Sequence, residues 1–224
     1  MTADSSPWIV VSDFDGTITT EDIGNGLCQK FRSELFTKVI HQYELGNMNL
    51  RAEQHILWKG FPLGEAEFKR EATQIASFRP LANEFLEKCA THKIPVYIAS
   101  CGMRPYIDAV LSAQASPKAL QAIKEIRCNE VEFDKDCIVK LITPIEDEKN
   151  PLPFHKGEWA KQLSQKHGGS KVLIIGDGSS DFSMIDSADQ IYATRKLAKK
   201  CKEKGLSFTP FEDFAPLLES PLFS

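Results

Sequence analysis

The sequence has 224 residues and a mass of 25.1 kDa, enough for one medium domain or for a domain that carries an inserted subdomain. Hydrophobic residues make up 42% and charged residues 26%, which excludes a disordered, collagen-like or coiled-coil chain. The formal net charge is −4, and lysines and arginines are scattered except in the run 195–204. Because no basic face is evident, nucleic acid is not an expected partner.

The six cysteines form no Cys-x-x-Cys pair and are too sparse for the disulfide framework of a small secreted protein. We therefore expect reduced thiols and a cytoplasmic protein. Residues 1–7 lack the basic segment and apolar stretch of an export signal. Apolar runs such as 172–175 are far shorter than the roughly 18 residues of a membrane span, so no membrane association is expected.

The first apolar run, residues 8–11, ends at a polar turn and has the composition of a strand buried on both faces. The runs 94–99 and 171–175 have the same form and also end at polar clusters. Apolar residues at helical spacing over 80–90 and 157–166 lie between these strands. Strands that alternate with helices predict an α/β fold with a doubly wound, mostly parallel sheet.

A helical insertion interrupts this alternation directly after the first strand. Apolar residues recur at helical spacing over 23–40, and Thr20 is the expected N-cap, followed by two acidic residues. We predict a core domain made of 1–21 and 79–224, with a helical cap domain at 22–78.

Two apolar segments, 128–133 and 137–143, flank a short polar turn and predict a small β-hairpin insertion near 127–143. A loop is expected at 146–153. The basic run 195–204 is expected to be the solvated face of a helix.

Four aspartates follow predicted strands. Asp13 and Asp15 leave the first strand two residues apart, so in extended geometry both side chains share one face. Asp177 and Asp181 follow the strand at 171–175, and ligands of doubly wound sheets bind where the carboxyl ends of the strands meet. Crowded carboxylates repel one another, and a hard cation with oxygen ligands relieves that repulsion. The aspartates therefore predict a metal site, for which Mg²⁺ is the typical ion.

A carboxylate nucleophile beside a divalent cation suits phosphoryl transfer through an aspartyl-phosphate. The transferring group also needs hydrogen-bond donors and a fixed positive charge. Ser100 and the backbone around Cys101 and Gly102 can supply the donors, and Lys156 can supply the charge.

In chain order, the motifs 13–17, Ser100, Lys156 and 176–181 resemble those of the haloacid dehalogenase superfamily of phosphohydrolases. The resemblance spans nearly the whole chain and implies a Rossmann-like core. It implies that Asp13 is the nucleophile. The residues implied to bind the phosphoryl group are Gly16, Thr17, Ser100, Cys101, Gly102 and Lys156.

The same resemblance assigns roles to the other aspartates. Asp15 would be the general acid and then the general base. Mg²⁺ would be held by the Asp13 carboxylate, the Asp15 backbone carbonyl and Asp177, with Asp181 as a ligand through water or as a supporting group.

A cap between the first and second motifs is similar to that of the phosphoserine phosphatase-like subgroup. The segments 13–19, 128–134 and 208–214 are similar to methionine-salvage phosphatases that hydrolyse a methylthiopentenyl phosphate, with phosphocholine and phosphoethanolamine phosphatases related to them.

Three positions depart from the phosphoserine phosphatase pattern. Cys101 replaces the first of two glycines after the serine of the second motif, Ser180 replaces an asparagine, and Asp22 replaces the glutamate that binds the substrate ammonium. A substrate carboxylate would need an arginine, for which Arg79 is one candidate. The expected specificity residues are Asp22, Arg51, Met103 and Arg104.

These observations predict a phosphoric monoester hydrolase that acts on a small phosphorylated metabolite as a monomer or homodimer. A phosphotransferase or phosphomutase would keep the same two aspartates and differ only in the acceptor. A catalytically silent phosphate-binding regulator on the same fold is the third reading. Asp15 argues against it, because a regulator has no use for a general acid and base.

Overall fold

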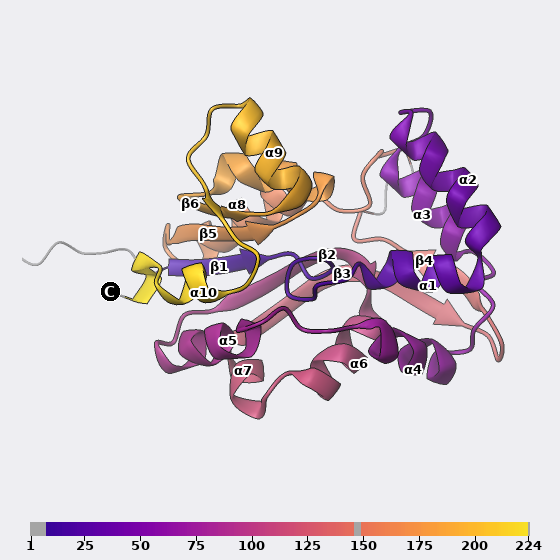
Figure 1. The fold of residues 1–224 in the computed structure, drawn as a ribbon, viewed down its shortest axis with the longest axis horizontal. Helices are drawn as coiled ribbons and strands as arrows, with labels where there is room; N and C mark the ends of the chain where they lie inside the picture. The colour runs from indigo at the N-terminus through magenta and orange to yellow at the C-terminus, as the bar shows by residue number, and fades with distance from the viewer. Residues whose placement is uncertain (1–7, 146–148, 224) are drawn as a thin grey trace, which may run out of the picture.

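The computed structural model describes residues 8–145 and 149–223. Its strands are β1 (Trp8–Ser12), β2 (Val96–Met103), β3 (Ile123–Phe133), β4 (Ile138–Ile142), β5 (Lys171–Gly176), β6 (Gln190–Ala193) and β7 (Thr209–Pro210). Within these residues the strands form one sheet in the order β4-β3-β2-β1-β5-β6-β7 (Figure 1). Only β4 runs antiparallel to its neighbour. The predicted doubly wound, mostly parallel sheet is confirmed.

Helices cover both faces of this sheet (Figure 1). Val10 of β1 packs in the core on one face, whereas Ile9 and Val11 pack in the core on the other, as side chains of successive strand residues must. The first face carries α5 (Ala82–Thr91), α6 (Arg104–Gln114), α7 (Pro117–Ala122) and α10 (Ala215–Leu218), and the short 3₁₀ helix Pro221–Phe223 follows α10. The second face carries α8 (Lys156–Lys166), the 3₁₀ helix η1 (Ser179–Ser187) and α9 (Arg195–Glu203).

The chain reverses its direction of travel across the sheet at β1. It passes from β1 to β2 on one side and later enters β5 on the other. The backbone amide of Asp13 donates to the Ile175 carbonyl at 2.9 Å, so the carboxyl ends of β1 and β5 are held side by side. Such a reversal point is where doubly wound sheets bind ligands.

Between β1 and α5 the chain forms the inserted helices α1 (Ile23–Phe31), α2 (Ser33–Glu44), α3 (Leu50–Trp58) and α4 (Glu65–Ile75). The expectation that Thr20 caps the first of them is wrong. Asp22 is the N-cap, and its carboxylate accepts from the Asn25 amide at 2.8 Å. Thr20 instead donates its backbone amide to the Ser77 carbonyl, because the chain enters and leaves the insertion side by side.

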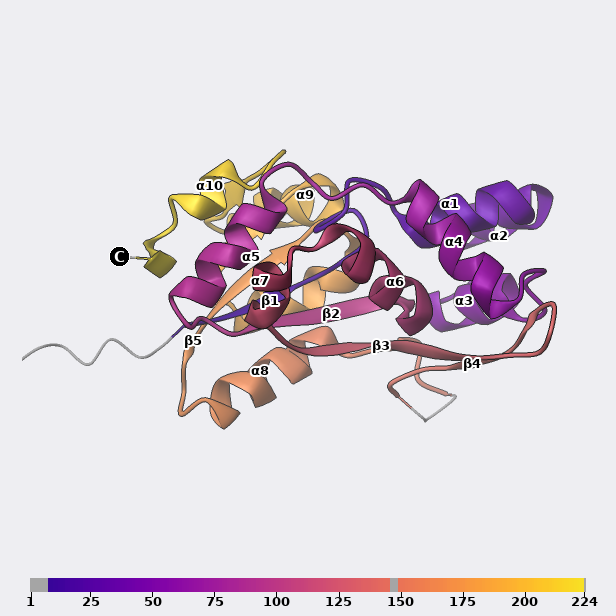
Figure 2. The same ribbon diagram turned by 90° about the horizontal axis from the view of Figure 1, so that it is seen from below.

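The inserted helices α1 to α3 gather at one end of the molecule (Figure 1), and β3 and β4 extend toward α3 (Figure 2). Backbone bonds join the two parts: the Gly60 amide donates to the Ile138 carbonyl at 2.8 Å, and the Ile138 amide donates to the Phe61 carbonyl at 3.0 Å. Trp58, Phe61 and Phe68 pack there as a buried aromatic cluster. These bonds join the inserted helices to the hairpin of β3 and β4. The division into a core domain and a cap domain at 22–78 stays a prediction.

Two strands are longer than the sequence predicts. β3 begins at Ile123 rather than at residue 128, since its first half pairs in parallel with β2 and its second half pairs with β4. β2 continues through Ser100 to Met103, with an irregular register after Ala99.

No helix of the described residues is long and apolar enough to cross a membrane. All six cysteines are free thiols. The predictions for residues 1–7, and part of the loop expected at 146–153, lie outside the described residues.

Candidate active site

Three carboxylates meet at the carboxyl ends of β1 and β5. The cluster contains one carboxylate oxygen from each of Asp13, Asp177 and Asp181, and these three oxygens lie within 4.8 Å of one another. Asp13 and Asp181 are buried. Burial, with the neighbouring charge of Asp181, raises the pKa of the Asp177 carboxyl to about 6. The structure brings together three of the four aspartates predicted to share one site, and the Asp15 carboxylate is not in this group.

Lys156 supplies the buried positive charge at this cluster. Its Nζ lies 2.8 Å from Asp13 Oδ1 and 2.7 Å from Asp181 Oδ1, and the residue is 0% exposed. Burial alone would lower the pKa of the Lys156 ammonium, but the two carboxylates outweigh it and hold that pKa well above its usual range. Burial and the Asp181 charge raise the pKa of the Asp13 carboxyl, against the opposing effect of Lys156. One buried cation therefore leaves part of the negative charge uncompensated.

Asp181 is held mainly by backbone donors. Its Oδ2 accepts from the amides of Asp177 and Gly178 at 3.0 and 2.9 Å. Its other oxygen, Oδ1, accepts from Lys156 Nζ. Asp181 therefore holds the Lys156 ammonium and the backbone at Asp177 in place.

Asp15 occupies a separate hydrogen-bonded position beside the cluster. Its Oδ2 accepts from the Tyr106 hydroxyl at 2.6 Å, and its Oδ1 accepts from the Ile23 amide at 3.1 Å. Burial and the nearby Asp22 charge raise the pKa of the Asp15 carboxyl to about 7, although both hydrogen bonds act in the opposite direction. A carboxyl group with a pKa near neutrality can both donate and accept a proton.

The loop after β1 is fixed by two arginines. The Arg79 guanidinium donates to the carbonyls of Gly16 and Thr17 at 2.5 and 2.8 Å, so this arginine fixes the backbone of the loop. Gly16 has a φ of +70°, and a β-carbon there would lie 2.6 Å from Asp177 Oδ2. Arg195 donates to the Thr20 carbonyl of the loop at 2.8 Å and to Asp177 Oδ2 at 3.2 Å, so it joins the loop to the segment after β5.

Ser100 lies at the irregular part of β2. Its Oγ accepts from the Gly102 amide at 2.8 Å and lies 3.5 Å from Asp15 Oδ2. A β-carbon on Gly102 would lie 1.9 Å from the Tyr106 hydroxyl, so the close approach requires glycine. Burial raises the pKa of the Cys101 thiol to about 12, which argues against a thiolate nucleophile.

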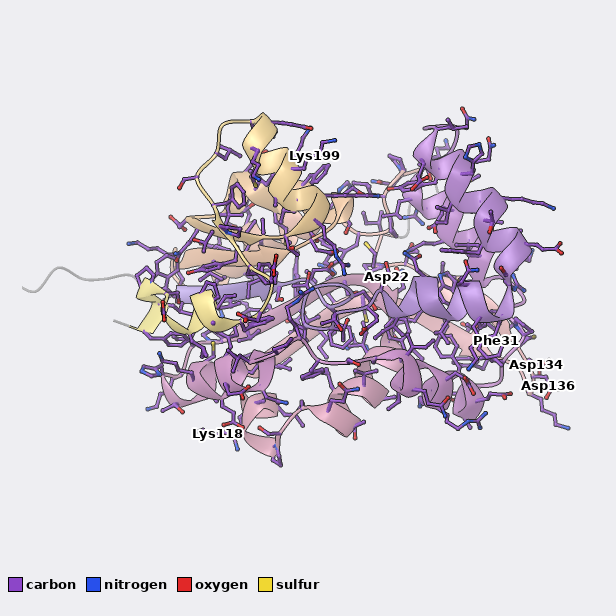
Figure 3. All side chains as sticks on the ribbon, viewed as in Figure 1. Asp22, Phe31, Lys118, Asp134, Asp136 and Lys199 are labelled. Atoms are coloured by element: carbon purple, nitrogen blue, oxygen red, sulfur yellow. The ribbon has the colours of Figure 1, made fainter. Side chains whose placement is uncertain are left out.

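A cavity of about 380 Å³ opens between these groups and the inserted helices. Asp13, Asp15 and Ser100 line its floor. Its other walls are formed by side chains of α1, α2 and α3, together with residues of α6 and α9 and of the segment after β5. Figure 3 shows Asp22 at the N-terminal end of α1, on the side of the inserted helices that faces the sheet.

A family model described as haloacid dehalogenase-like hydrolase matches residues 10–186. The chain belongs to the haloacid dehalogenase-like hydrolases. The match includes all four predicted motifs and the inserted helices, so the family resemblance is confirmed.

Relatives of this hydrolase align with it over more than nine-tenths of both chains. The 2-hydroxy-3-keto-5-methylthiopentenyl-1-phosphate phosphatase of Exiguobacterium sp. is 27% identical over 219 residues, which cover 92% of this chain and 93% of the relative. The protein of the same name from Bacillus mycoides is 26% identical over 216 residues, with 93% of each chain covered.

Solved structures share its fold. A phospho-aspartyl intermediate analogue of phosphoserine phosphatase superposes with a TM-score of 0.70 at 16% identity, covering 96% of this chain and 98% of the other. Phosphoserine phosphatase from T. onnurineus superposes with a TM-score of 0.67 at 17% identity, covering 98% and 96%.

The structure places two of the four expected specificity residues in the cavity wall of this hydrolase, Asp22 and Met103. It does not bring Arg51 or Arg104 there. The Arg51 guanidinium donates to Thr143 Oγ1 and to three backbone carbonyls of the segment 145–152, and Arg104 pairs with Glu130 at 3.0 Å.

Sequence reasoning missed several residues that complete the site. Tyr106 lies one turn into the helix that follows the serine motif, and this position was the signal that could have found it. Gln54 joins the inserted helices to β2 by donating to the Cys101 carbonyl at 2.8 Å. Glu53 and Trp58 line the cavity from α3 and belong to no motif.

Proposed function

We propose that this hydrolase is a Mg²⁺-dependent phosphomonoesterase that cleaves a small phosphorylated metabolite through an aspartyl-phosphate on Asp13. The observation that carries the proposal is the pairing of Asp13 with the fully buried Lys156, while Asp15 lies two residues away on the same cavity. The family is one of hydrolases, and the curated relatives are named as phosphatases.

In the first step, an Asp13 oxygen attacks the substrate phosphorus and the bond from phosphorus to the leaving oxygen breaks. Asp15 gives its proton to that oxygen, so the product leaves as a neutral alcohol or enol. In the second step, Asp15 takes a proton from water, the water oxygen attacks phosphorus, and the bond to Asp13 breaks. A pKa of about 7 suits Asp15 for both transfers.

Lys156, Ser100 and the backbone from Cys101 to Gly102 would hold the phosphoryl oxygens, together with the loop that contains Gly16 and Thr17. Because these donors are already oriented before the reaction, they stabilise the charge that develops on the phosphoryl group in the transition state. The inserted helices limit access of bulk water to the cavity.

The donor set also fits Mg²⁺. Asp13, Asp177 and the backbone carbonyl of Asp15 would hold the ion, with Asp181 supporting them. Three carboxylate oxygens within 4.8 Å and the raised pKa values of Asp13 and Asp177 indicate charge that a hard cation would offset. When bound, such an ion neutralises negative charge on the phosphoryl group and the nucleophile.

The substrate is proposed to be a small metabolite, because a cavity of about 380 Å³ lies at the lower end of the range for small-molecule sites. The relatives favour a methionine-salvage enol phosphate, and phosphoserine and phosphocholine-type esters are the other candidates. We place the protein in the cytoplasm, in line with its free thiols.

Release of inorganic phosphate from these esters, measured with Mg²⁺ and with EDTA, tests the proposal. We expect metal-dependent release by the wild type and a loss of at least 1,000-fold in Asp13→Asn, since removal of a nucleophile costs about that or more. Transfer of the phosphoryl group to an added alcohol without free phosphate would favour a transferase. Unchanged turnover in Asp13→Asn would refute the mechanism.

A further inference from the structure

The segment 100–102, which contains the serine of the second motif, lies in a bulge of β2. Ala99 of β2 pairs with Arg127 of β3. The next pair joins Met103 to Asn129, so three residues of β2 lie opposite one residue of β3. A bulge interrupts the regular ladder and turns its residues out of it. Contacts outside the ladder must therefore fix the peptide groups of this segment.

Two side-chain amides bind the carbonyl in the middle of the bulge. Gln54 of α3 donates its Nε2 to the Cys101 carbonyl at 2.8 Å, and Asn129 of β3 donates its Nδ2 to the same oxygen at 2.7 Å. Asn129 Nδ2 also donates to Gln54 Oε1 at 2.9 Å, which joins the two amides to each other. Both residues are buried, and Asn129 is 0% exposed. The carbonyl is held from the sheet and from the inserted helices at once.

Asn129 lies in the one orientation that serves this carbonyl. Its two neighbours, Gln54 Oε1 and the Cys101 carbonyl oxygen, are acceptors, so the nitrogen of the Asn129 amide must face them. Its Oδ1 is buried and has no hydrogen-bond partner among residues 8–145 and 149–223. Buried polar atoms normally have partners. An asparagine that leaves its oxygen unpaired here contributes through the two bonds that its nitrogen makes.

The bound carbonyl fixes the amide at the other end of the same peptide unit. The Cys101 carbonyl and the Gly102 amide belong to one planar trans unit, in which they point in opposite directions. The Gly102 amide donates to Ser100 Oγ at 2.8 Å. Because this bond uses a lone pair of the hydroxyl oxygen, Ser100 keeps its hydrogen for an acceptor in the cavity that it lines. A rotation of this peptide would displace the amide and the hydroxyl together.

We propose that Gln54 and Asn129 are positioning residues that orient the Ser100 hydroxyl toward the phosphoryl group through the peptide between Cys101 and Gly102. The inference rests on the proposed function, since it assigns both amides a role in phosphoryl binding. It also makes the inserted helices part of the phosphoryl-binding site, because one of the two amides comes from α3. Neither amide acts on a reacting atom itself.

A direct contact with the substrate is the competing role for Gln54, because its side chain also lines the cavity. Both ends of its amide are already engaged, Nε2 by the Cys101 carbonyl and Oε1 by Asn129. A contact with the leaving group would give losses of activity that differ among esters. Positioning of a phosphoryl donor gives the same loss for every ester, because all esters share the phosphoryl group.

A double-mutant cycle on kcat/KM for phosphate release tests the proposal. Gln54→Met keeps the length of the side chain and removes both hydrogen bonds. We expect it to lower kcat/KM by about 10- to 100-fold for every ester, as a small misplacement of a binding group can. In the Ser100→Ala background the same change is expected to lower kcat/KM by less than about threefold, because the group that it positions is already absent.

Two further variants complete the cycle. Asn129→Leu, of similar shape, is expected to show the same pattern as Gln54→Met. Gln162→Met makes the same chemical change as Gln54→Met on an exposed residue of α8 outside the cavity lining, and is expected to change nothing. Circular dichroism and urea unfolding check that the variants are folded, and Gln54→Met carries the test if Asn129→Leu is not.

The outcomes separate this proposal from the proposed function. An equal fall in kcat/KM with and without the Ser100 hydroxyl would assign the two amides a structural role and overturn the proposal. A fall that differs among the esters, or no fall in Gln54→Met, would also overturn it. These results leave the phosphatase intact, since the wild type and Asp13→Asn are measured beside the variants. No phosphate release by the wild type from any ester would overturn both.

Discussion

Replacement of Glu53 by glutamine should stabilise the fold at pH 8 and have little effect at pH 5. The pKa of Glu53 is about 8 in the folded protein, against 4.5 for an unperturbed glutamate. Between these values the unfolded chain has released a proton that the folded chain still holds. The free energy of unfolding therefore falls as the pH rises through this interval, and glutamine removes that dependence.

The magnitude follows from the same two values. At about 1.4 kcal/mol for each pH unit, the interval from 4.5 to about 8 gives at most about 5 kcal/mol. Water in the cavity can solvate the ionised Glu53, and its proton is coupled to that of Asp22, so we expect a gain of about 2 kcal/mol at pH 8. Glutamine has nearly the same volume, so packing contributes little to the difference.

Urea unfolding at pH 5, 6.5 and 8 measures this difference for the wild type, Glu53→Gln and the surface control Glu34→Gln. The gain of Glu53→Gln over the wild type should grow steadily with pH, while the control follows the wild type. A gain that is the same at every pH, or a variant less stable than the wild type at pH 8, would show that Glu53 is not a buried, unpaired acid.

Three other substitutions test the positions of site residues. Gly102→Ala should reduce phosphate release more than 100-fold in a folded protein, because its β-carbon would lie 1.9 Å from the Tyr106 hydroxyl; near-normal activity would show that this approach is not required. Lys156→Met should lower the free energy of unfolding by about 3 kcal/mol at neutral pH, as measured in urea, because Asp13 loses its buried counter-charge. Arg51→Lys should lower the free energy of unfolding by about 1–3 kcal/mol, because bonds to backbone carbonyls are lost. It should lower kcat/KM by the same factor for all esters; a change in substrate preference would show that Arg51 is a specificity residue.

The core of the site could be predicted from the sequence because its residues lie at strand ends. Asp13 and Asp177 each follow a continuous apolar run, and parallel strands bring such positions to one edge of the sheet. The order of motifs then identified the family, which the family match confirms.

The walls of the cavity could not be predicted in the same way. Glu53 lies on an amphipathic helix whose polar residues carry no motif, and only the packing of α3 over the sheet turns this acid inward. Arg51, two residues earlier, looked like a substrate contact, but its partners are mostly backbone carbonyls of a distant segment. Backbone acceptors leave no trace in a sequence, so neither side chain could be placed without the fold.

The most direct test of the proposed mechanism is to trap the phosphoenzyme. The slow variant Asp15→Asn would be mixed with substrate and Mg²⁺, quenched in acid, digested and analysed by mass spectrometry. We predict one phosphoryl group on the peptide that contains Asp13, removable by hydroxylamine and absent in Asp13→Asn. Phosphate release without any such adduct in either the wild type or Asp15→Asn, or an adduct on another residue, would contradict the account.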